Sequence, residues 1–144
     1  MGGRALRAGL ELTLCELDRG GTARAAEGLQ RALATRDDVE VVPIAQPGAA
    51  RPGSGGRIAR GLARELSWLP ARLALQSRRL GLDLLHCPGP LVPARSPVPL
   101  VVTIFDALSW RHPEWLTRAN VASHRLVVRR GVRRAAAVLS LIHI

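Results

Sequence analysis

One segment of this sequence joins an apolar run directly to residues that can bind a ligand. Pro99–Phe105 reads PLVVTIF, Asp106 follows at once, and residues 110–115 read WRHPEW. A nearly continuous apolar run is typical of a central parallel strand that is covered on both faces. Because ligands of such sheets bind beyond the carboxyl ends of the strands, we expect Asp106 to line a binding crevice. The alternative is that the Asp106 carboxylate caps a short turn.

A second candidate site is the pair Gly20 and Gly21, which stands just before a helical pattern. Glycines let the backbone approach a ligand closely, and the N–H groups of a helix N-terminus favour phosphate. Thr22 is expected to cap this helix. The alternative is a plain turn from strand to helix. The sequence lacks the G-x-G-x-x-G fingerprint of dinucleotide-binding proteins, and it has no Walker A loop because it contains no lysine.

The third candidate is His86, which ends another apolar segment and precedes a loop stiffened by prolines, CPGPLVP. A histidine in this place can act as a general base. The alternative is a histidine whose ring is satisfied by hydrogen bonds to the backbone of a rigid turn. Cys15 and Cys87 stand far apart in apolar segments, which indicates reduced core cysteines. No histidines or cysteines have the spacing of metal ligands, so we expect no metal.

The composition favours one folded domain and excludes several classes of protein. The chain has 144 residues, of which 47% are hydrophobic, and this is enough to bury a core. Its net charge is +10, and its basic residues are arginines, with no lysine. Because surfaces that bind nucleic acid normally use lysine as well, we expect no nucleic-acid partner. No apolar run could cross a bilayer, and Glu11 and Glu16 interrupt any signal peptide, so the expected location is cytoplasmic.

Apolar strand patterns and helical patterns alternate along the chain. This alternation predicts an α/β fold, an open parallel sheet with right-handed crossovers and helices on both faces. A surface loop is expected over residues 46–57. The expected strands are Leu10–Cys15, Val39–Ile44, Leu82–Cys87, Pro99–Phe105 and Ala135–Leu139. The expected helices are Thr22–Leu33, residues 58–69 with a continuation over Leu73–Leu80 beyond Pro70, and Arg118–Arg133.

Four segments resemble, in order and spacing, the N-terminal domain of family 4 glycosyltransferases. They are RGGTARAAEGLQRALA, DLLHCPGPLVP, PVPLVVTIFDALSWRHPEW and RRGVRRAAAV, and the likeness covers residues 8–138. The resemblance implies the GT-B architecture, in which two Rossmann-like domains face each other across a cleft. It also implies retaining, metal-independent transfer of a sugar from a nucleotide donor to a glycan or lipid-linked acceptor. No cofactor is implied, since the nucleotide sugar is a co-substrate.

The resemblance also gives roles to the candidate residues. The Gly-rich turn would lie near the donor phosphates and the acceptor. Asp106 matches the family pattern Thr-x-His-Asp-Leu, whereas Phe105 stands where the family has a histidine that faces the transferred sugar. The catalytic residue is therefore left unassigned, and the alternative function is a non-catalytic nucleotide-binding or regulatory α/β domain. The expected substrate-binding residues are Gly20, Gly21, Thr22, His86, Phe105 and Asp106.

The C-terminal end of the sequence is expected to be truncated. Residues 139–144 read LSLIHI, a peptide that the mosaic end of transposase-made sequencing libraries encodes. A glycosyltransferase N-terminal domain over residues 1–138 and a non-native tail over residues 139–144 are therefore predicted. The alternative is a natural strand rich in Leu and Ile. In the family most donor-binding residues, including a pair of glutamates, belong to a C-terminal domain, so this fragment alone is expected to be inactive.

A row of arginines follows one side of the last predicted helix. Arg125, Arg129 and Arg133 are spaced four residues apart, and Arg130 and Arg134 flank them. Many members of the family glycosylate lipid-linked acceptors at the cytoplasmic leaflet. The row is therefore predicted to give peripheral contact with anionic membrane, worth roughly 1 kcal/mol per residue near the surface. The alternative is a solvated helix face.

Overall fold

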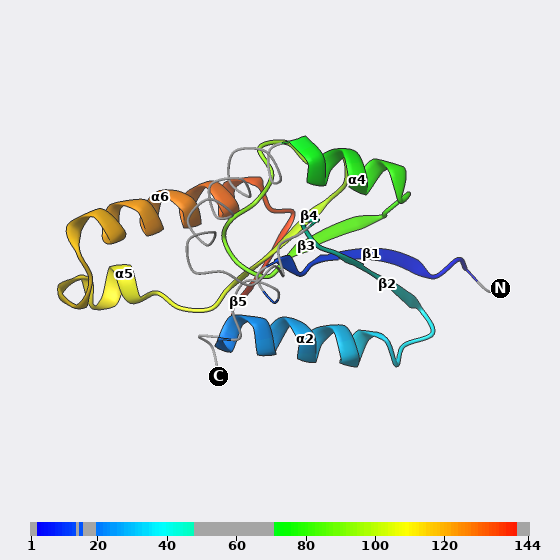
Figure 1. Cartoon of the computed structure of the whole chain (residues 1–144), viewed down its shortest axis with the longest axis horizontal. Coiled ribbons are helices and arrows are strands. Elements are labelled where there is room, and N and C mark those ends of the chain that lie inside the picture. The colour runs from blue at the N-terminus through cyan, green and yellow to red at the C-terminus, as the bar shows by residue number, and fades with distance from the viewer. Residues whose placement is uncertain (1–2, 14, 16–19, 48–70, 141–144) are drawn as a thin grey trace.

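A five-stranded, all-parallel sheet forms the centre of the protein in a computed structural model that describes residues 3–13, 15, 20–47 and 71–140. The order across the sheet is β2-β1-β3-β4-β5 (Figure 1). This is the Rossmann-like α/β fold that the alternation of patterns predicts. The strands are β1 (Leu6–Glu11), β2 (Val39–Ile44), β3 (Leu84–Cys87), β4 (Leu100–Ile104) and β5 (Ala137–Ser140). The helices are α2 (Gly21–Leu33), α4 (Leu73–Arg79), α5 (Leu108–Arg111), η2 (Pro113–Trp115) and α6 (Arg118–Arg134).

Helices cover both faces of this sheet. In Figure 1, α2 lies below the strands, and α4 and α6 lie above them. Since successive strand residues point to opposite faces, each strand divides its side chains between the two layers. The layer beneath α4 holds the main core, in which Leu73, Leu85 and Val102 are completely buried. Burying an aliphatic side chain of this size stabilises the fold by about 1.5–3 kcal/mol.

The predicted strands and helices agree with the structure except near the N-terminus. β2 has the predicted bounds, and α6 ends one residue later than predicted. The prediction for the first strand was wrong, because β1 begins at Leu6 and ends at Glu11. Parallel pairing sets these limits, since Leu6 lies opposite Val39 and Glu11 lies opposite Ile44. The expected helix over residues 58–69 and most of the expected loop over residues 46–57 lie outside the described residues.

The role expected for Thr22 at the start of α2 was also wrong. The N-cap is Gly20, which has no side chain to cap the helix, and Thr22 lies inside the first turn. By contrast, Thr117 caps α6, because its hydroxyl accepts a hydrogen bond from the Asn120 N–H at 3.2 Å. The segment of residues 110–115 is largely helical as well, since it belongs to α5 and η2.

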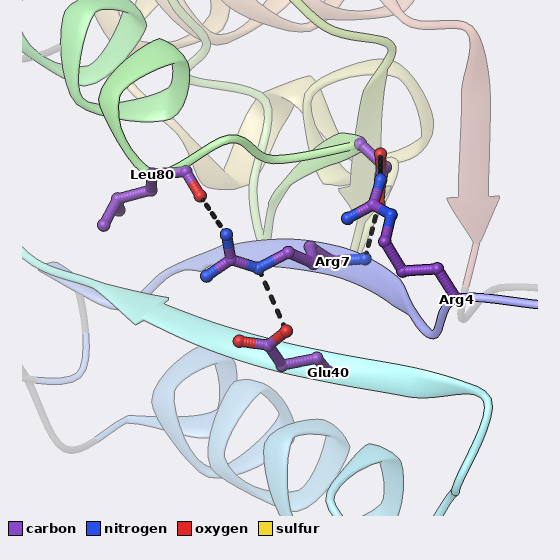
Figure 2. A network of polar contacts seen from close by, with 5 residues as sticks. Arg4, Arg7, Glu40 and Leu80 are labelled. Carbon is purple, nitrogen blue, oxygen red and sulfur yellow. Dashed lines mark hydrogen bonds and ion pairs between the residues drawn. The ribbon is translucent and has the colours of Figure 1, made fainter.

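A polar network closes the sheet at the amino end of β1 (Figure 2). The Arg7 guanidinium lies between two neighbours, and it donates to the Leu80 carbonyl at 2.6 Å and pairs with Glu40 at 3.0 Å. The Arg7 N–H donates to the Asp83 carboxylate at 2.8 Å, and Arg4 pairs with the same carboxylate. The hydrogen bond from the Arg7 backbone N–H is the main cause of the lowered pKa of the Asp83 carboxyl. These contacts join β1, β2 and the turn before β3, and they explain why β1 begins earlier than its apolar pattern suggests.

The C-terminal strand includes two residues of the expected tail. Leu139 and Ser140 pair with Thr103 and Ile104 of β4 and form the end of β5. The other residues of the expected tail, 141–144, lie outside the described part of the chain.

Candidate functional site

A crevice lies at the carboxyl ends of the strands, where the strand order reverses. From β1 the chain passes first to β2 on one side and later to β3 on the other. In open parallel sheets, such a reversal parts the loops that follow the two strands and leaves room for a ligand. The crevice has a volume of about 150 Å³. Its lining residues are Thr22, Gly89, Pro90, Ile104, Phe105, Asp106, His124 and Val128.

Elements far apart in sequence deliver these residues to the crevice. Thr22 comes from the first turn of α2, which follows β1. Phe105 and Asp106 directly follow β4, so the structure brings three of the six predicted site residues together. Gly20, Gly21 and His86 do not line this crevice.

Asp106 caps a turn and also lines the crevice. One carboxylate oxygen, Oδ1, accepts a hydrogen bond from the Leu108 N–H at 2.9 Å, which is the turn-capping contact. Within the described residues, Oδ2 makes no hydrogen bond, and the side chain lines the crevice. Asp106 therefore caps the turn into α5 with one oxygen, and its other oxygen has no hydrogen-bond partner among the described residues.

The Gly-rich turn does not need glycine for its own backbone. Gly20 is extended, with φ −69° and ψ −173°, a conformation open to any residue. Among the described residues, no atom would lie within 4 Å of a Cβ atom added to Gly21. The turn contributes Thr22 to the crevice.

Two other glycines, which the sequence did not single out as site residues, shape the crevice wall. Gly89 has φ +141°, a conformation that side chains with a Cβ atom rarely adopt. A Cβ atom on Gly131 would lie 2.7 Å from the Pro90 carbonyl oxygen, so α6 rests directly on the loop after β3. These close contacts determine how far α6 stands from the sheet, and α6 carries His124.

His124 is a crevice residue that sequence reasoning missed. Its Nδ1 lies 3.0 Å from the Ser109 Oγ, and its ring meets Trp110 edge-on at a centroid distance of 6.1 Å. A signal was available in the helix pattern. His124, Val128 and Gly131 are spaced at i, i+4 and i+7, which places a histidine on the inner face of α6.

His86 lies within β3, away from the crevice. Its side chain is 6% exposed, and Nε2 lies 2.8 Å from the Thr103 Oγ1. Burial lowers the pKa of His86 to about 4, so the ring is neutral at physiological pH. It lines a separate cavity of about 210 Å³ between α2 and the sheet, among apolar residues such as Leu10, Leu29 and Val101. The hydrogen bond to Thr103 gives His86 a structural role, with a side-chain hydroxyl as partner instead of the expected turn backbone.

A second hollow adjoins the crevice along α6. It has a volume of about 370 Å³ and shares Gly89, Pro90 and His124 with the crevice. Asn120 and Ser123 add polar side chains, and its remaining lining residues are Leu91 and Val127. We call this hollow the α6 groove. A ligand with one ring in the crevice can continue along the α6 groove.

Arg125, the first arginine of the predicted row on α6, packs against α5. Its Nε and Nη2 donate to the Ser109 carbonyl at 2.9 and 2.6 Å. The guanidinium also lies 5.8 Å from the centroid of the Trp110 ring. Arg129 and Arg133 remain exposed.

A buried polar cluster closes the carboxyl end of β1 next to the Gly-rich turn. The Glu11 side chain is fully buried, and Oε1 accepts from the Thr13 N–H at 3.2 Å. The Thr13 hydroxyl accepts in turn from the Gln46 N–H at 2.9 Å. Because a buried carboxylate is stable only with such partners, this cluster serves the fold at the end of β1.

The described residues contain neither a membrane-spanning helix nor a cluster of metal ligands. None of the helices that the structure describes is long and apolar enough to cross a membrane. Within the same residues, no three or more His, Cys, Asp or Glu side chains gather as metal ligands would. Comparison of the chain with protein-family models, curated proteins and solved structures found no match.

Proposed function

We propose that this chain is the acceptor-side domain of a retaining glycosyltransferase, which transfers a sugar from a nucleotide donor to a glycan or lipid-linked acceptor. One observation carries the proposal. Three of the four segments that resemble family 4 glycosyltransferases supply lining residues to one crevice at the strand ends. They contribute Thr22, the pair Gly89 and Pro90, and the pair Phe105 and Asp106.

The chemistry of the crevice suits an uncharged, hydroxylated ligand. Among the residues that the structure describes, its polar side chains are Thr22, Asp106 and His124, and no arginine lines it. A diphosphate needs cations or several backbone N–H groups around it. The hydroxyls of a sugar need paired donors and acceptors, which these three side chains offer. The crevice is therefore proposed as the place of the acceptor sugar, and a second domain of the complete enzyme would hold the diphosphate.

The mechanism assigned to this domain is orientation of the acceptor. As the donor sugar loses its nucleoside diphosphate, positive charge grows on the sugar ring. The free oxygen of Asp106 would bind the acceptor hydroxyl and direct it towards that ring. Phe105 would present an apolar surface to the sugar where the family has a histidine. The proposed reaction uses no cofactor or metal. The proposed location of the protein is cytoplasmic.

Titration of the ¹⁵N-labelled chain tests the proposal. The probes are the methyl glycosides of glucose, mannose, galactose, rhamnose and N-acetylglucosamine, followed by UDP, GDP and ADP. A glycoside should shift the amide signals of Thr22, Gly89 and Asp106. Asp106→Asn should weaken binding of that glycoside, whereas Asp83→Asn, at the amino ends of the strands, should leave its affinity unchanged. If no glycoside shifts any crevice signal, the acceptor role is wrong.

The same titration tests the alternative function, a non-catalytic nucleotide-binding domain. One observation favours it: no side chain of the described residues caps the first N–H groups of α2, whose N-cap is Gly20. A nucleoside diphosphate that shifts Gly21 and Ala23, with every glycoside silent, would establish this alternative.

A further inference from the structure

The two ring nitrogens of His124 have different surroundings. Nδ1 lies against the Ser109 Oγ at 3.0 Å. Nε2 has no hydrogen-bond partner among the described residues, and it is not among the buried polar atoms that lack one. Nε2 is therefore open to solvent, on a side chain that lines both the crevice and the α6 groove.

Ser109 determines which nitrogen of His124 carries the proton. Ser109 is completely buried, and within the described residues its Oγ has no partner other than His124. If Nδ1 carried the proton, the buried Ser109 hydroxyl hydrogen would have no acceptor, at a cost of about 1–3 kcal/mol. The Ser109 O–H therefore donates to Nδ1. A neutral imidazole that accepts at Nδ1 carries its proton on Nε2.

Neighbouring side chains hold this pair in place. The Ser109 carbonyl accepts both hydrogen bonds from Arg125, and Arg125 also lies near the Trp110 ring. Trp110 in turn meets the His124 ring edge-on, with 62° between the ring planes. The imidazole is thus oriented before any ligand binds, and a group ordered in advance costs less entropy on binding.

We propose that His124 is a ligand-contacting residue of the crevice, whose Nε2–H donates a hydrogen bond to a hydroxyl oxygen of the acceptor sugar. Ser109 is its positioning residue. Asp106 Oδ2 supplies an acceptor in the same crevice, so neighbouring hydroxyls of one sugar ring can bind both groups. The volume of about 150 Å³ is below the roughly 300 Å³ of ordinary small-molecule pockets, so a single ring fits there and the rest of the acceptor lies in the α6 groove. This inference rests on the proposed function.

The tautomer is tested by ¹⁵N NMR of histidine-labelled protein without ligand. Wild-type His124 should show the proton on Nε2. Ser109→Ala should let the proton distribute between the two nitrogens while the spectrum elsewhere stays folded. A wild-type ring protonated at Nδ1, or a tautomer unaffected by Ser109→Ala, would overturn the positioning role.

The ligand contact is tested by the affinity of the glycoside that binds most tightly in the titration above. His124→Phe keeps a flat ring but removes the donor, and it should raise Kd about tenfold. His124→Gln restores an N–H donor and should recover part of the affinity. His112→Phe is the matched control, because His112 is exposed, stacks on Trp115 and does not line the crevice.

The possible outcomes separate this inference from the proposed function. If a glycoside binds and His124→Phe leaves its Kd unchanged in a folded variant, the role of His124 is wrong while the acceptor site stands. If no glycoside binds wild-type protein, the proposed function fails and the inference fails with it. If His124→Phe does not fold, the Nε2 signal of wild-type His124 decides. A shift of that signal when the glycoside binds supports the contact, and absence of a shift overturns it.

Discussion

Acidification from pH 6.5 to about 4 should destabilise this protein through His86. In the folded chain, burial lowers the pKa of His86 from 6.5 to about 4. The unfolded chain exposes the ring, which then takes up a proton near pH 6.5. Between these two pH values the unfolded state binds more protons than the folded state. The free energy of unfolding therefore falls as the pH drops from about 6.5 to about 4, and it is unaffected by His86 above about pH 7.

The size of the loss follows from the difference between the two pKa values. At about 1.4 kcal/mol for each pKa unit, the fall from 6.5 to about 4 amounts to about 3 kcal/mol in full. Most of this, more than about 2 kcal/mol, should be lost by pH 4.5. Since small domains are stable by only about 5–15 kcal/mol, such a loss is easy to measure.

Urea unfolding followed by circular dichroism at pH 7.5, 6.5, 5.5 and 4.5 measures this loss. His86→Gln removes the titrating ring and keeps a group that can bond Thr103, so its stability should be nearly flat over this range. Gly28→Ala is the control, because it changes no titrating side chain and its Cβ atom would meet no described atom within 4 Å, so the wild-type pH dependence should be unchanged. A wild-type stability that does not change between pH 7.5 and 4.5, or an equal slope in His86→Gln, would refute the assignment of a buried, neutral His86.

Three further predictions concern other parts of the fold. Gly131→Ala should lower the free energy of unfolding by about 1–3 kcal/mol in the same urea assay, because its Cβ atom would meet the Pro90 carbonyl. Gly28→Ala in α2 should raise the free energy of unfolding by about 0.5–1 kcal/mol, because its Cβ atom would meet no described atom within 4 Å. Asp83→Asn should lower the free energy of unfolding at pH 7, because the pKa of Asp83 is lowered in the folded state. The difference in free energy of unfolding from wild type should shrink as the pH falls below about 4. A difference that persists at pH 2 would contradict this prediction. Arg129→Glu with Arg133→Glu should abolish co-sedimentation with anionic vesicles, and equal sedimentation with neutral vesicles would leave the solvated helix face as the interpretation.

The sequence by itself determined the layers of the fold and the end of the sheet where a site could lie. The apolar run before Asp106 indicates a buried parallel strand, and the observed strand is β4, Leu100–Ile104. β2 and α6 were also predictable to within a residue, because local apolar periodicity and caps specify them. A pattern of this kind is local, and it survives in any tertiary arrangement that buries the apolar side.

The tertiary structure alone decided which residues meet. His86 and Cys87 are neighbours in sequence, yet strand alternation sends His86 towards α2 and Cys87 into the core beneath α4. The start of β1 depends on Asp83, which is 76 residues from Arg7 along the chain. His124 reaches the crevice only because Gly131 lets α6 rest on Pro90 and because Ser109 lies across from its ring. Contacts between such distant residues depend on how whole elements pack, and no local pattern of side chains encodes them.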